Sequence, residues 1–387
     1  MTTEQILEKL IAFPVLGGDS NLTIINWIKE YIESFQIKVT LVPNEEGTKA
    51  SLHCRIGPAV DGGIILSGHT DVVPVTGQAW DTDPFQLTDK GDGKLYGRGS
   101  CDMKGFIAIC LHLLPTMIEA KPAKPIYFAF SYDEEIGCLS APDLVKHIKK
   151  TYPEKPKYAL IGEPSMLQPI LAQKGIIVFV TQVNGSAGHS SRIKQQVSAV
   201  HEASRLVLWL ETKMNTLIET NKKDARFEPP HTTIHVGQFN GGIAPNVIAD
   251  KATFSWDLRT IPTDSVDAIL KDFKQHCEQR EVELTSVFSD FRIKTVAKHP
   301  EVVHLDTHHD KDIASLIQTI SGSSNFKAVS FASEAGQFAQ GGFESVICGP
   351  GSIAQAHTAN EFIAKEQLQK GEAMLKKLIQ EMSTSQS

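Results

Sequence analysis

Acidic and imidazole side chains directly follow several short apolar runs of this 387-residue chain. His69 and Asp71 come just after the run Gly63–Ser67, and Glu163 comes just after Tyr158–Ile161. Such runs predict buried strands, and ligands of open α/β sheets collect beyond the carboxyl ends of strands. A histidine in the pattern His-x-Asp can bind a metal while the nearby carboxylate orients its ring. Each signal alone is weak, because a lone histidine near a strand end is usually structural.

Three consecutive carboxylates, Asp133, Glu134 and Glu135, follow the apolar run Ile126–Ser131. Their mutual repulsion suits a solvated turn equally well, but a bound metal cluster would offset it. Adjacent carboxylates could then have different duties, one as a metal ligand and one as a proton carrier.

A glycine-rich stretch, Gly97–Gly105, precedes an apolar helical pattern and carries Asp102. It fits neither the dinucleotide-binding pattern nor the phosphate-loop pattern, so it does not indicate a nucleotide site. An acidic residue at such a junction ordinarily caps the helix. His357 completes the series, in a loop after the predicted strand Glu344–Cys348.

Five of these side chains form a candidate ligand set, namely His69, Asp102, Glu135, Glu163 and His357. Oxygen and imidazole ligands suit zinc, cobalt or manganese, and the lack of cysteine in the set disfavours a purely structural zinc site. Five ligands are more than one catalytic zinc uses, but they suffice for two metals that share a bridging carboxylate. The sequence therefore predicts a dinuclear metal site.

Bulk properties exclude other classes of partner. The net charge is −7, and no basic cluster is strong enough to grip nucleic-acid phosphates. No apolar run approaches the roughly 20 residues that span a bilayer, so we expect no membrane partner. The first residues lack a signal-peptide pattern and the six cysteines are scattered, which leads us to expect a cytoplasmic protein.

Strands alternate with helices along most of the chain, which indicates an α/β fold with a central, mostly parallel sheet. Between residues 176 and 291 the order becomes strand-helix-strand-strand-helix-strand, typical of a ferredoxin-like α+β module. We expect the last strand of that module at Glu281–Phe288. The predicted organisation is a catalytic domain in two parts, 1–175 and 292–387, interrupted by an inserted domain at 176–291.

The assembled motifs resemble those of the dinuclear zinc amidohydrolases, a family that includes acetylornithine deacetylases, succinyl-diaminopimelate desuccinylases, aminoacylases and carboxypeptidases of the same fold. The resemblance covers essentially the whole chain and rests on SGHTD at 67–71, GRGSCDMKG at 97–105, DEEIG at 133–137, GEP at 162–164 and the segment around His357. It implies a zinc-peptidase-like catalytic domain, an inserted dimerisation or lid domain and a homodimer. It also implies two Zn²⁺ per chain, for which Co²⁺ could substitute.

The resemblance further implies a role for each site residue. The ligands would divide into two sets that share Asp102 as a bridge, one with His69 and Glu163 and the other with Glu135 and His357. Glu134 would be the general base, and Asp71 would be the carboxylate behind the first histidine.

Three residues of the inserted domain match substrate-contacting positions of the family. His189 would stabilise the developing oxyanion, and in related enzymes it reaches the site of the partner subunit. Asn246 and Arg259 would hold the substrate carboxylate, a task that suits the planar fork of arginine. The segment Arg192–Ala199 departs from the family pattern, which usually has a Pro-x-Gly turn here, and this puts the substrate preference in doubt.

The implied reaction is metal-dependent hydrolysis of the amide bond in a small N-acyl amino acid. Segments around Trp80, Cys138 and His357 resemble the acetylornithine deacetylases, which implies conversion of N2-acetyl-L-ornithine and water to L-ornithine and acetate in arginine biosynthesis. Desuccinylase, aminoacylase and dipeptidase activities are alternatives within the family. A non-catalytic binding relative is a further alternative, which the intact ligand set and Glu134 disfavour.

Overall fold

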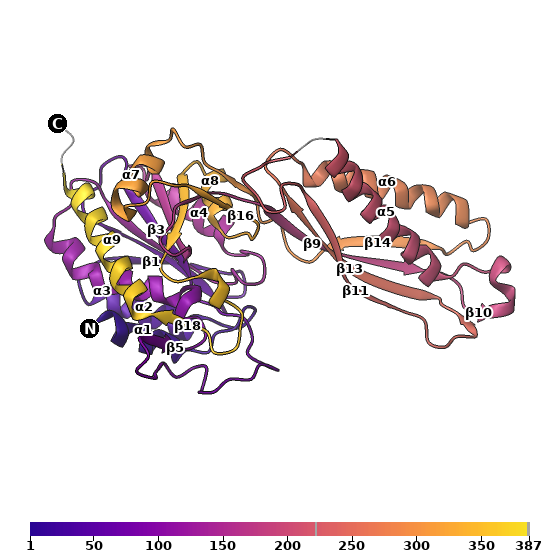
Figure 1. Cartoon of the computed structure of the whole chain (residues 1–387), viewed down its shortest axis with the longest axis horizontal. Coiled ribbons are helices and arrows are strands. Elements are labelled where there is room, and N and C mark those ends of the chain that lie inside the picture. Colours follow the sequence, from indigo (N-terminus) through magenta and orange to yellow (C-terminus); the bar gives the residue numbers. More distant parts are fainter. Residues whose placement is uncertain (221–222, 385–387) are drawn as a thin grey trace. The chain divides into compact units, whose positions relative to one another are not determined.

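The computed structural model describes residues 1–220 and 223–384, which form two compact units (Figure 1). Unit 1 comprises Met1–Gln173, Leu305–Ala328 and Ser333–Ser387, and unit 2 comprises Lys174–His304 and Val329–Ala332. The boundaries predicted from the sequence, 175/176 and 291/292, compare with structural junctions at 173/174 and 304/305. The second junction lies later because the last strand of unit 2 and the segment after it stay with that unit.

Unit 1 is built on a mixed sheet with the strand order β1-β2-β6-β3-β7-β17-β8-β15, and β16 pairs with β8. Its strands are β1 (Val39–Pro43), β2 (Ala50–Ile56), β3 (Ile64–His69), β6 (Ile126–Ser131), β7 (Tyr158–Pro164), β8 (Ile170–Gln173), β15 (Leu305–Asp306), β16 (Lys327–Val329) and β17 (Glu344–Gly349). The central strands β6, β3, β7 and β17 are parallel, and β1, β2, β8 and β15 pair antiparallel around them. The predicted α/β class is thereby confirmed, with its parallel part at the centre.

Helices cover both faces of this sheet (Figure 1). One face shares a hydrophobic core with α1 (Thr3–Ile11), α2 (Leu22–Glu33), α3 (Gly105–Glu119), α7 (Asp312–Ser321) and α9 (Lys365–Ser383). The other face meets α4 (Ala141–Thr151) and α8 (Ala335–Gln340). Strand β6 shows why both layers are needed, because it is buried at every position. Its Phe128 and Phe130 belong to the first core, while Tyr127 between them contacts Tyr152 just after α4.

One helix among the described residues, Ser100–Glu119, is long and apolar enough to cross a membrane by composition, with a mean hydropathy of 1.4. It combines α3 with the irregular turn η1 (Ser100–Lys104), and 78% of its most apolar stretch is buried. That burial is what the central helix of a packed core requires.

A small antiparallel sheet, β18-β5-β4, completes the strands of unit 1. Its strands are β4 (Thr88–Asp89), β5 (Lys94–Tyr96) and β18 (Phe362–Ala364). Phe362 pairs with Tyr96, so the residues just before β18 lie beside the loop that follows β5. The short helix η3 (Ile353–Gln355) precedes His357.

Unit 2 has a four-stranded antiparallel sheet in the order β11-β13-β9-β14, with α5 and α6 on one face (Figure 1). Its main elements are β9 (Gly175–Asn184), α5 (Ala199–Glu219), β11 (Thr233–Gly241), β13 (Lys251–Thr260), α6 (Val266–Leu284) and β14 (Arg292–Ala297). Two short strands, β10 (Gly188–His189) and β12 (Val247–Ile248), pair beside the turn η2 (Ser190–Gln195). The βαββαβ element order is that of a ferredoxin-like module.

The predicted strand at Glu281–Phe288 is wrong. Helix α6 continues to Leu284, and both Leu284 and Phe288 pack against the core of unit 2. The strand forms later, at Arg292–Ala297, on the edge of the sheet and largely exposed. An exposed edge strand needs few apolar side chains, so its hydrophobic pattern was weaker than that of the helix end before it.

Candidate metal centre

The predicted ligands of unit 1 emerge where the parallel strands end. Strand β3 ends at His69, which pairs with Ser131 at the end of β6. Glu163 lies in the last residues of the neighbouring strand β7, beside an irregularity in its pairing with β17. The parallel register brings these ends to one edge of the sheet, so side chains distant in sequence face one space.

Asp71 organises both the first histidine and the acidic turn. His69 Nδ1 lies 2.9 Å from the Asp71 carbonyl oxygen and 3.6 Å from Asp71 Oδ1. The backbone N–H groups of Glu134 and Glu135 each donate to the Asp71 carboxylate at 3.2 Å. A ring that donates through Nδ1 keeps the lone pair of Nε2 for a metal.

Asp102 presents one carboxylate oxygen to each of two histidines. Its Oδ1 lies 3.1 Å from His69 Nε2, and its Oδ2 lies 3.4 Å from His357 Nε2. The side chain is almost completely buried, at 7% exposure. Two imidazole nitrogens that face different oxygens of one carboxylate form the arrangement expected around a bridging ligand.

The remaining carboxylates complete the cluster. Glu135 Oε2 lies 3.0 Å from His357 Nε2, and Glu163 Oε1 lies 3.9 Å from His69 Nε2. Two groups have ligand atoms within 4.8 Å of one another, namely His69 with Asp102 and Glu135, and His69 with Glu134 and Glu163. The structure thus brings together all five predicted ligands and places Glu134 among them.

The electrostatics of the cluster favour bound cations. Four buried carboxylates face two imidazoles, and burial raises the pKa of Glu134 to about 8, with the charges of Glu135 and Asp102 adding to the effect. Burial also raises the pKa of Glu163 well above its ordinary value. Divalent ions would balance this surplus of negative charge, and the donor set of oxygen and imidazole fits zinc. The residues present therefore fit a pair of metals.

The substrate-contacting residues predicted in unit 2 lie in two places. His189 pairs with Val247 across β10 and β12, and the Asn246 carbonyl next to it accepts a hydrogen bond from the Ser190 N–H at 3.0 Å. Arg259 lies near the far end of β13 and donates to the Ser330 carbonyl at 3.2 Å. The structure therefore groups His189 with Asn246 and separates both from Arg259.

The hydrogen bonds of His189 select one form of its ring. The Ser191 N–H donates to His189 Nδ1 at 3.3 Å, so Nδ1 is an acceptor. In the neutral ring the proton then lies on Nε2, which leaves an exposed donor. Such a donor is what stabilisation of an oxyanion requires.

Sequence reasoning missed two polar side chains beside the cluster. Cys138 Sγ lies 3.3 Å from Glu134 Oε1, and its thiol donates to that carboxylate. Glu334, with 1% exposure, accepts a hydrogen bond from Ser67 Oγ at 2.5 Å, and burial raises its pKa. Cys138 could have been found, because it lies four residues after Glu134. Glu334 could not, because it follows no predicted strand.

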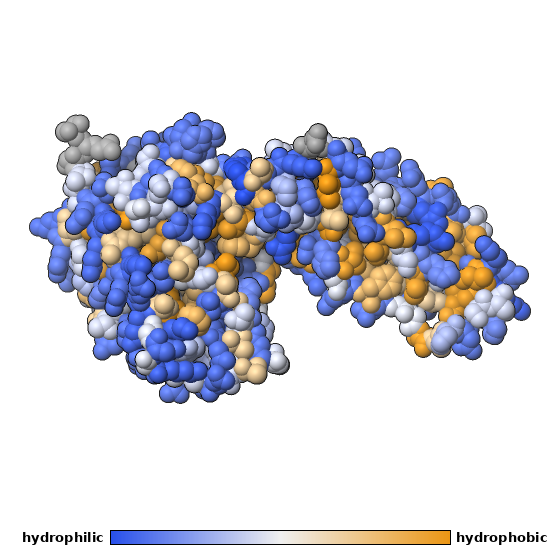
Figure 2. Space-filling view, viewed as in Figure 1, coloured by the Kyte–Doolittle hydropathy of each residue, from blue (hydrophilic) through white to orange (hydrophobic). Residues whose placement is uncertain are grey.

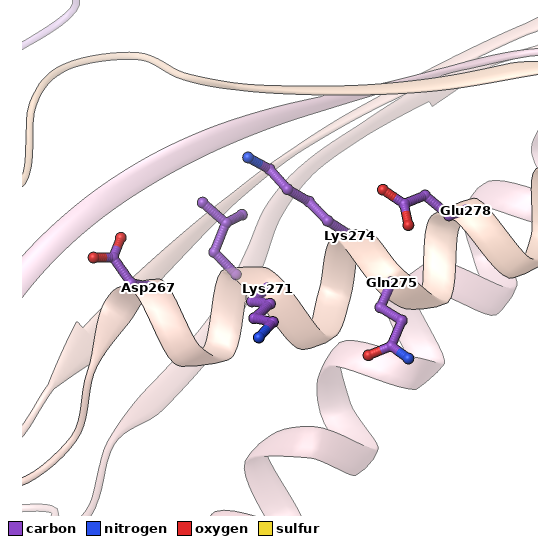
Figure 3. Close-up of a pocket in the computed structure, with 6 residues that line it drawn as sticks. Asp267, Lys271, Lys274, Gln275 and Glu278 are labelled. Atoms are coloured by element: carbon purple, nitrogen blue, oxygen red, sulfur yellow. The ribbon is translucent and has the colours of Figure 1, made fainter.

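A surface hollow on unit 2 offers no comparable constellation. It is lined by residues of α6 alone, namely Asp267, Leu270, Lys271, Lys274, Gln275 and Glu278 (Figure 3). The two acidic residues are eleven positions apart, which is about 16 Å along a helix. They cannot share one ligand, so the cluster at the sheet edge is the candidate site.

Comparisons with known proteins agree with this geometry. Residues 65–381 match the family model "Peptidase family M20/M25/M40". The chain is 30% identical over 392 residues to an acetylornithine deacetylase of Pasteurella multocida, with 98% of both chains covered. An M20 family metallo-carboxypeptidase from Sulfolobus solfataricus has a similar structure, with a TM-score of 0.79, 16% identity and coverage of 98% of this chain and 99% of that one.

A dinuclear metal binding peptidase of the M20 family from Bacillus subtilis is also similar in fold, with a TM-score of 0.61, 13% identity and coverage of 98% and 97%. The fold and the acidic cluster define a metal-binding hydrolase. The chain belongs to the peptidase family M20/M25/M40, and it is an enzyme that hydrolyses amide bonds.

Proposed function

We propose that this enzyme uses two zinc ions to hydrolyse N2-acetyl-L-ornithine to L-ornithine and acetate. The observation that carries the metal assignment is the placement of the two oxygens of Asp102 against His69 and His357. One ion would be held by Asp102, His69 and Glu163, and the other by Asp102, Glu135 and His357. The substrate is suggested by the similarity to acetylornithine deacetylases over nearly the whole chain. Co²⁺ would bind the same donors.

In the proposed mechanism Glu134 moves the proton. The metals, when bound, would supply a lowered pKa of water and polarisation of the amide carbonyl. Glu134 would accept a proton from the attacking water and then transfer it to the leaving amine. Its position among the cluster residues suits a group that must both take and give a proton at the reacting atoms.

His189 and Arg259 would act on one substrate only if they come from different copies of the chain. Arg259 pairs with Ile176 at the start of β9, whereas His189 lies beyond Asn184 at its end. Eight residues of strand span about 26 Å, which is longer than an N-acyl amino acid. We therefore propose a homodimer in which His189 and the neighbouring Asn246 serve the site of the partner subunit. Asn246 of one copy and Arg259 of the other would then bind the substrate carboxylate.

The surface of unit 2 supports this association. Leu208 of α5, a helix that packs on β11, and Ile243 just after β11 are apolar and more than half exposed, at 60% and 86%. Apolar patches on unit 2 are visible in Figure 2. Strand β11 is also an edge of the sheet, and most of its residues are exposed. Exposed apolar surface beside an unpaired strand edge is typical of a protein interface.

The six buried free cysteines suit the cytoplasmic location that we also propose.

A succinyl group is the second candidate for the acyl part. In η2 the basic residues Arg192 and Lys194 are exposed next to His189. They lie where the family usually has a Pro-x-Gly turn. Cations beside the residue that contacts the acyl carbonyl would favour an acyl group with its own carboxylate. An N-succinyl amino acid has that group.

A substrate panel tests the proposal. The zinc-loaded enzyme is assayed with N2-acetyl-L-ornithine, other N-acetyl amino acids, N-succinyl-diaminopimelate and dipeptides, and release of free amine is measured. We expect the highest kcat/KM for N2-acetyl-L-ornithine. A higher value for the succinyl substrate would replace the acetyl assignment, and cleavage of dipeptides alone would refute deacetylation.

A further inference from the structure

A buried ion pair lies directly behind the metal centre. Arg98 Nη1 donates to Glu361 Oε2 at 2.8 Å, and each side chain is only 1% exposed. Arginine commonly binds substrate carboxylates, but a guanidinium sealed from solvent cannot reach one. Breaking a buried pair is costly, so the pair holds its surroundings in one arrangement.

Glu361 fixes the loop that carries Asp102. The backbone N–H groups of Gly99, Cys101 and Asp102 all donate to the Glu361 carboxylate, at 2.9, 2.9 and 3.0 Å. With Arg98, the two oxygens accept four charge-assisted hydrogen bonds, which are stronger than neutral ones. The main chain of the bridging ligand is therefore set by a residue that does not itself belong to the ligand set.

Gln78 connects the same ion pair to His357. Arg98 Nη2 donates to Gln78 Oε1, and Gln78 Nε2 donates to the His357 carbonyl at 2.8 Å. Trp80 Nε1 also donates to Gln78 Oε1, and its ring lies 5.2 Å from the guanidinium. A continuous chain of hydrogen bonds thus runs from the N–H of Asp102 to the carbonyl of His357.

We propose that Glu361, Arg98 and Gln78 are positioning residues that set the spacing between Asp102 and His357. The ligand roles on which this rests belong to the proposed function. The side chain of His357 is 56% exposed and its φ angle is +62°, so packing around it is sparse and its backbone conformation is uncommon. The hydrogen bond from Gln78 therefore matters most for this histidine. Because Asp102 is shared, Glu361 would affect both metals, whereas Gln78 would affect only the metal that His357 binds.

Zinc binding to the metal-free full-length chain tests this difference. Calorimetric titration with Zn²⁺ gives both binding constants, and the absorption spectrum of the Co²⁺ form reports ligand geometry. In Glu361→Gln an amide would face backbone donors, and we expect both constants to fall by about 10- to 100-fold. In Gln78→Leu we expect one constant to fall by about tenfold, while the other stays within about twofold.

A matched control is Glu154→Gln, which weakens the partly buried Arg55–Glu154 pair elsewhere in unit 1. This variant should bind two Zn²⁺ with wild-type constants. Unchanged constants in both Glu361→Gln and Gln78→Leu, or equal loss of both metals in Gln78→Leu, would overturn the proposal. If Glu361→Gln does not fold, the zinc-binding constants of Gln78→Leu decide the question, because Gln78 is partly exposed and its replacement disturbs the fold less. Tight binding of two Zn²⁺ without hydrolysis of any N-acyl amino acid would refute the proposed function. It would leave the positioning role intact, because that role is judged by the binding constants alone.

Discussion

Two buried carboxylates at the metal centre differ in what surrounds them. Burial alone would raise the pKa of Asp102, but hydrogen bonds from His357 and His69 hold it well below its ordinary value. For Glu134, burial is reinforced by the charges of Glu135 and Asp102, and the pKa rises to about 8. The same chemical group therefore favours its charged form at one position and its neutral form at the other when no metal is bound.

Replacing Glu134 separates these two duties. In Glu134→Gln we expect kcat to fall by about 10²- to 10⁴-fold, because the amide cannot accept the proton from water. Zinc content should remain that of the wild type, measured by elemental analysis of the dialysed protein. Glu135→Gln is the matched control, and it should lose zinc as well as turnover. Near-wild-type turnover in Glu134→Gln would exclude its role as the base.

For single residues, the sequence predicted the candidate ligands that follow buried strands. It did not predict Glu361, which fixes the loop of Asp102. His69 and Glu163 stand directly after or within apolar runs, so their common location followed from the order of the elements. Glu361 could not be found in that way. Its partner Gly99 lies 262 positions away, and only the pairing of β18 with β5 brings the two together.

The approach of β7 to helix α3 fixes the backbone beside Glu163. A Cβ atom on Gly162 would lie 2.1 Å from the ring of Phe106, so this strand can pass the helix only as glycine. We expect Gly162→Ala to destabilise the fold by about 1–3 kcal/mol in urea unfolding. Adding Phe106→Leu should recover part of this loss. At Gly237 the nearest atom to an added Cβ is 3.5 Å away, so Gly237→Ala should be nearly neutral. An equally neutral Gly162→Ala would disprove the close approach.

The contact between β2 and α4 makes stability depend on pH. His53 Nδ1 lies 2.8 Å from Tyr152 Oη, and burial, with the charge of His147, lowers the His53 pKa to about 4. The unfolded chain binds this proton at about pH 6.5. Between about pH 6.5 and about pH 4 the unfolded state therefore holds more protons, and stability falls as the pH falls.

The variant His53→Gln removes this contribution. The free energy of unfolding, measured in urea at several pH values across that interval, should decline less steeply for His53→Gln than for the wild type. Carboxylates contribute equally to both proteins, so the difference in slope belongs to His53. Identical slopes would show that the buried ring gains its proton as easily as in the unfolded chain.

Buried elements were predictable, and the exposed edge was not. Strands such as β6 are apolar throughout because both faces are covered, which makes their pattern unmistakable. Strand β14 is covered on one face and lies at the sheet edge, so only weak alternation marks it. The preceding helix end, with Leu284 and Phe288 packed on the core, presented the stronger apolar signal.

At the scale of the whole molecule, mixed dimers test whether two copies build each site. Glu134→Gln retains His189, and His189→Ala retains Glu134. If His189 serves the partner subunit, a hybrid dimer of these variants has one complete site. Random exchange makes half of the dimers hybrid, so mixing two nearly inactive proteins should restore about a quarter of wild-type activity. The activity of the mixture is compared with that of each variant alone, and no recovery after proven exchange would place His189 in its own subunit's site.

The insertion of one unit into the other could be predicted because the order of elements changes near residue 175. The predicted second boundary, 291/292, lies before β14 rather than after it, because the predicted last strand, Glu281–Phe288, comes too early in the chain. Residues such as Arg259 could be assigned only through resemblance, since a single half-buried arginine in a strand has no distinguishing pattern.

In the proposed function a pair of metals at the Asp102 cluster drives hydrolysis of an N-acyl amino acid. The most direct measurement adds Zn²⁺ stepwise to the metal-free enzyme and follows acetate release from N2-acetyl-L-ornithine. We predict negligible turnover without metal and a maximum when two Zn²⁺ are bound per chain. Full turnover in the presence of a strong chelator, or a maximum at one Zn²⁺ per chain, would contradict the dinuclear site.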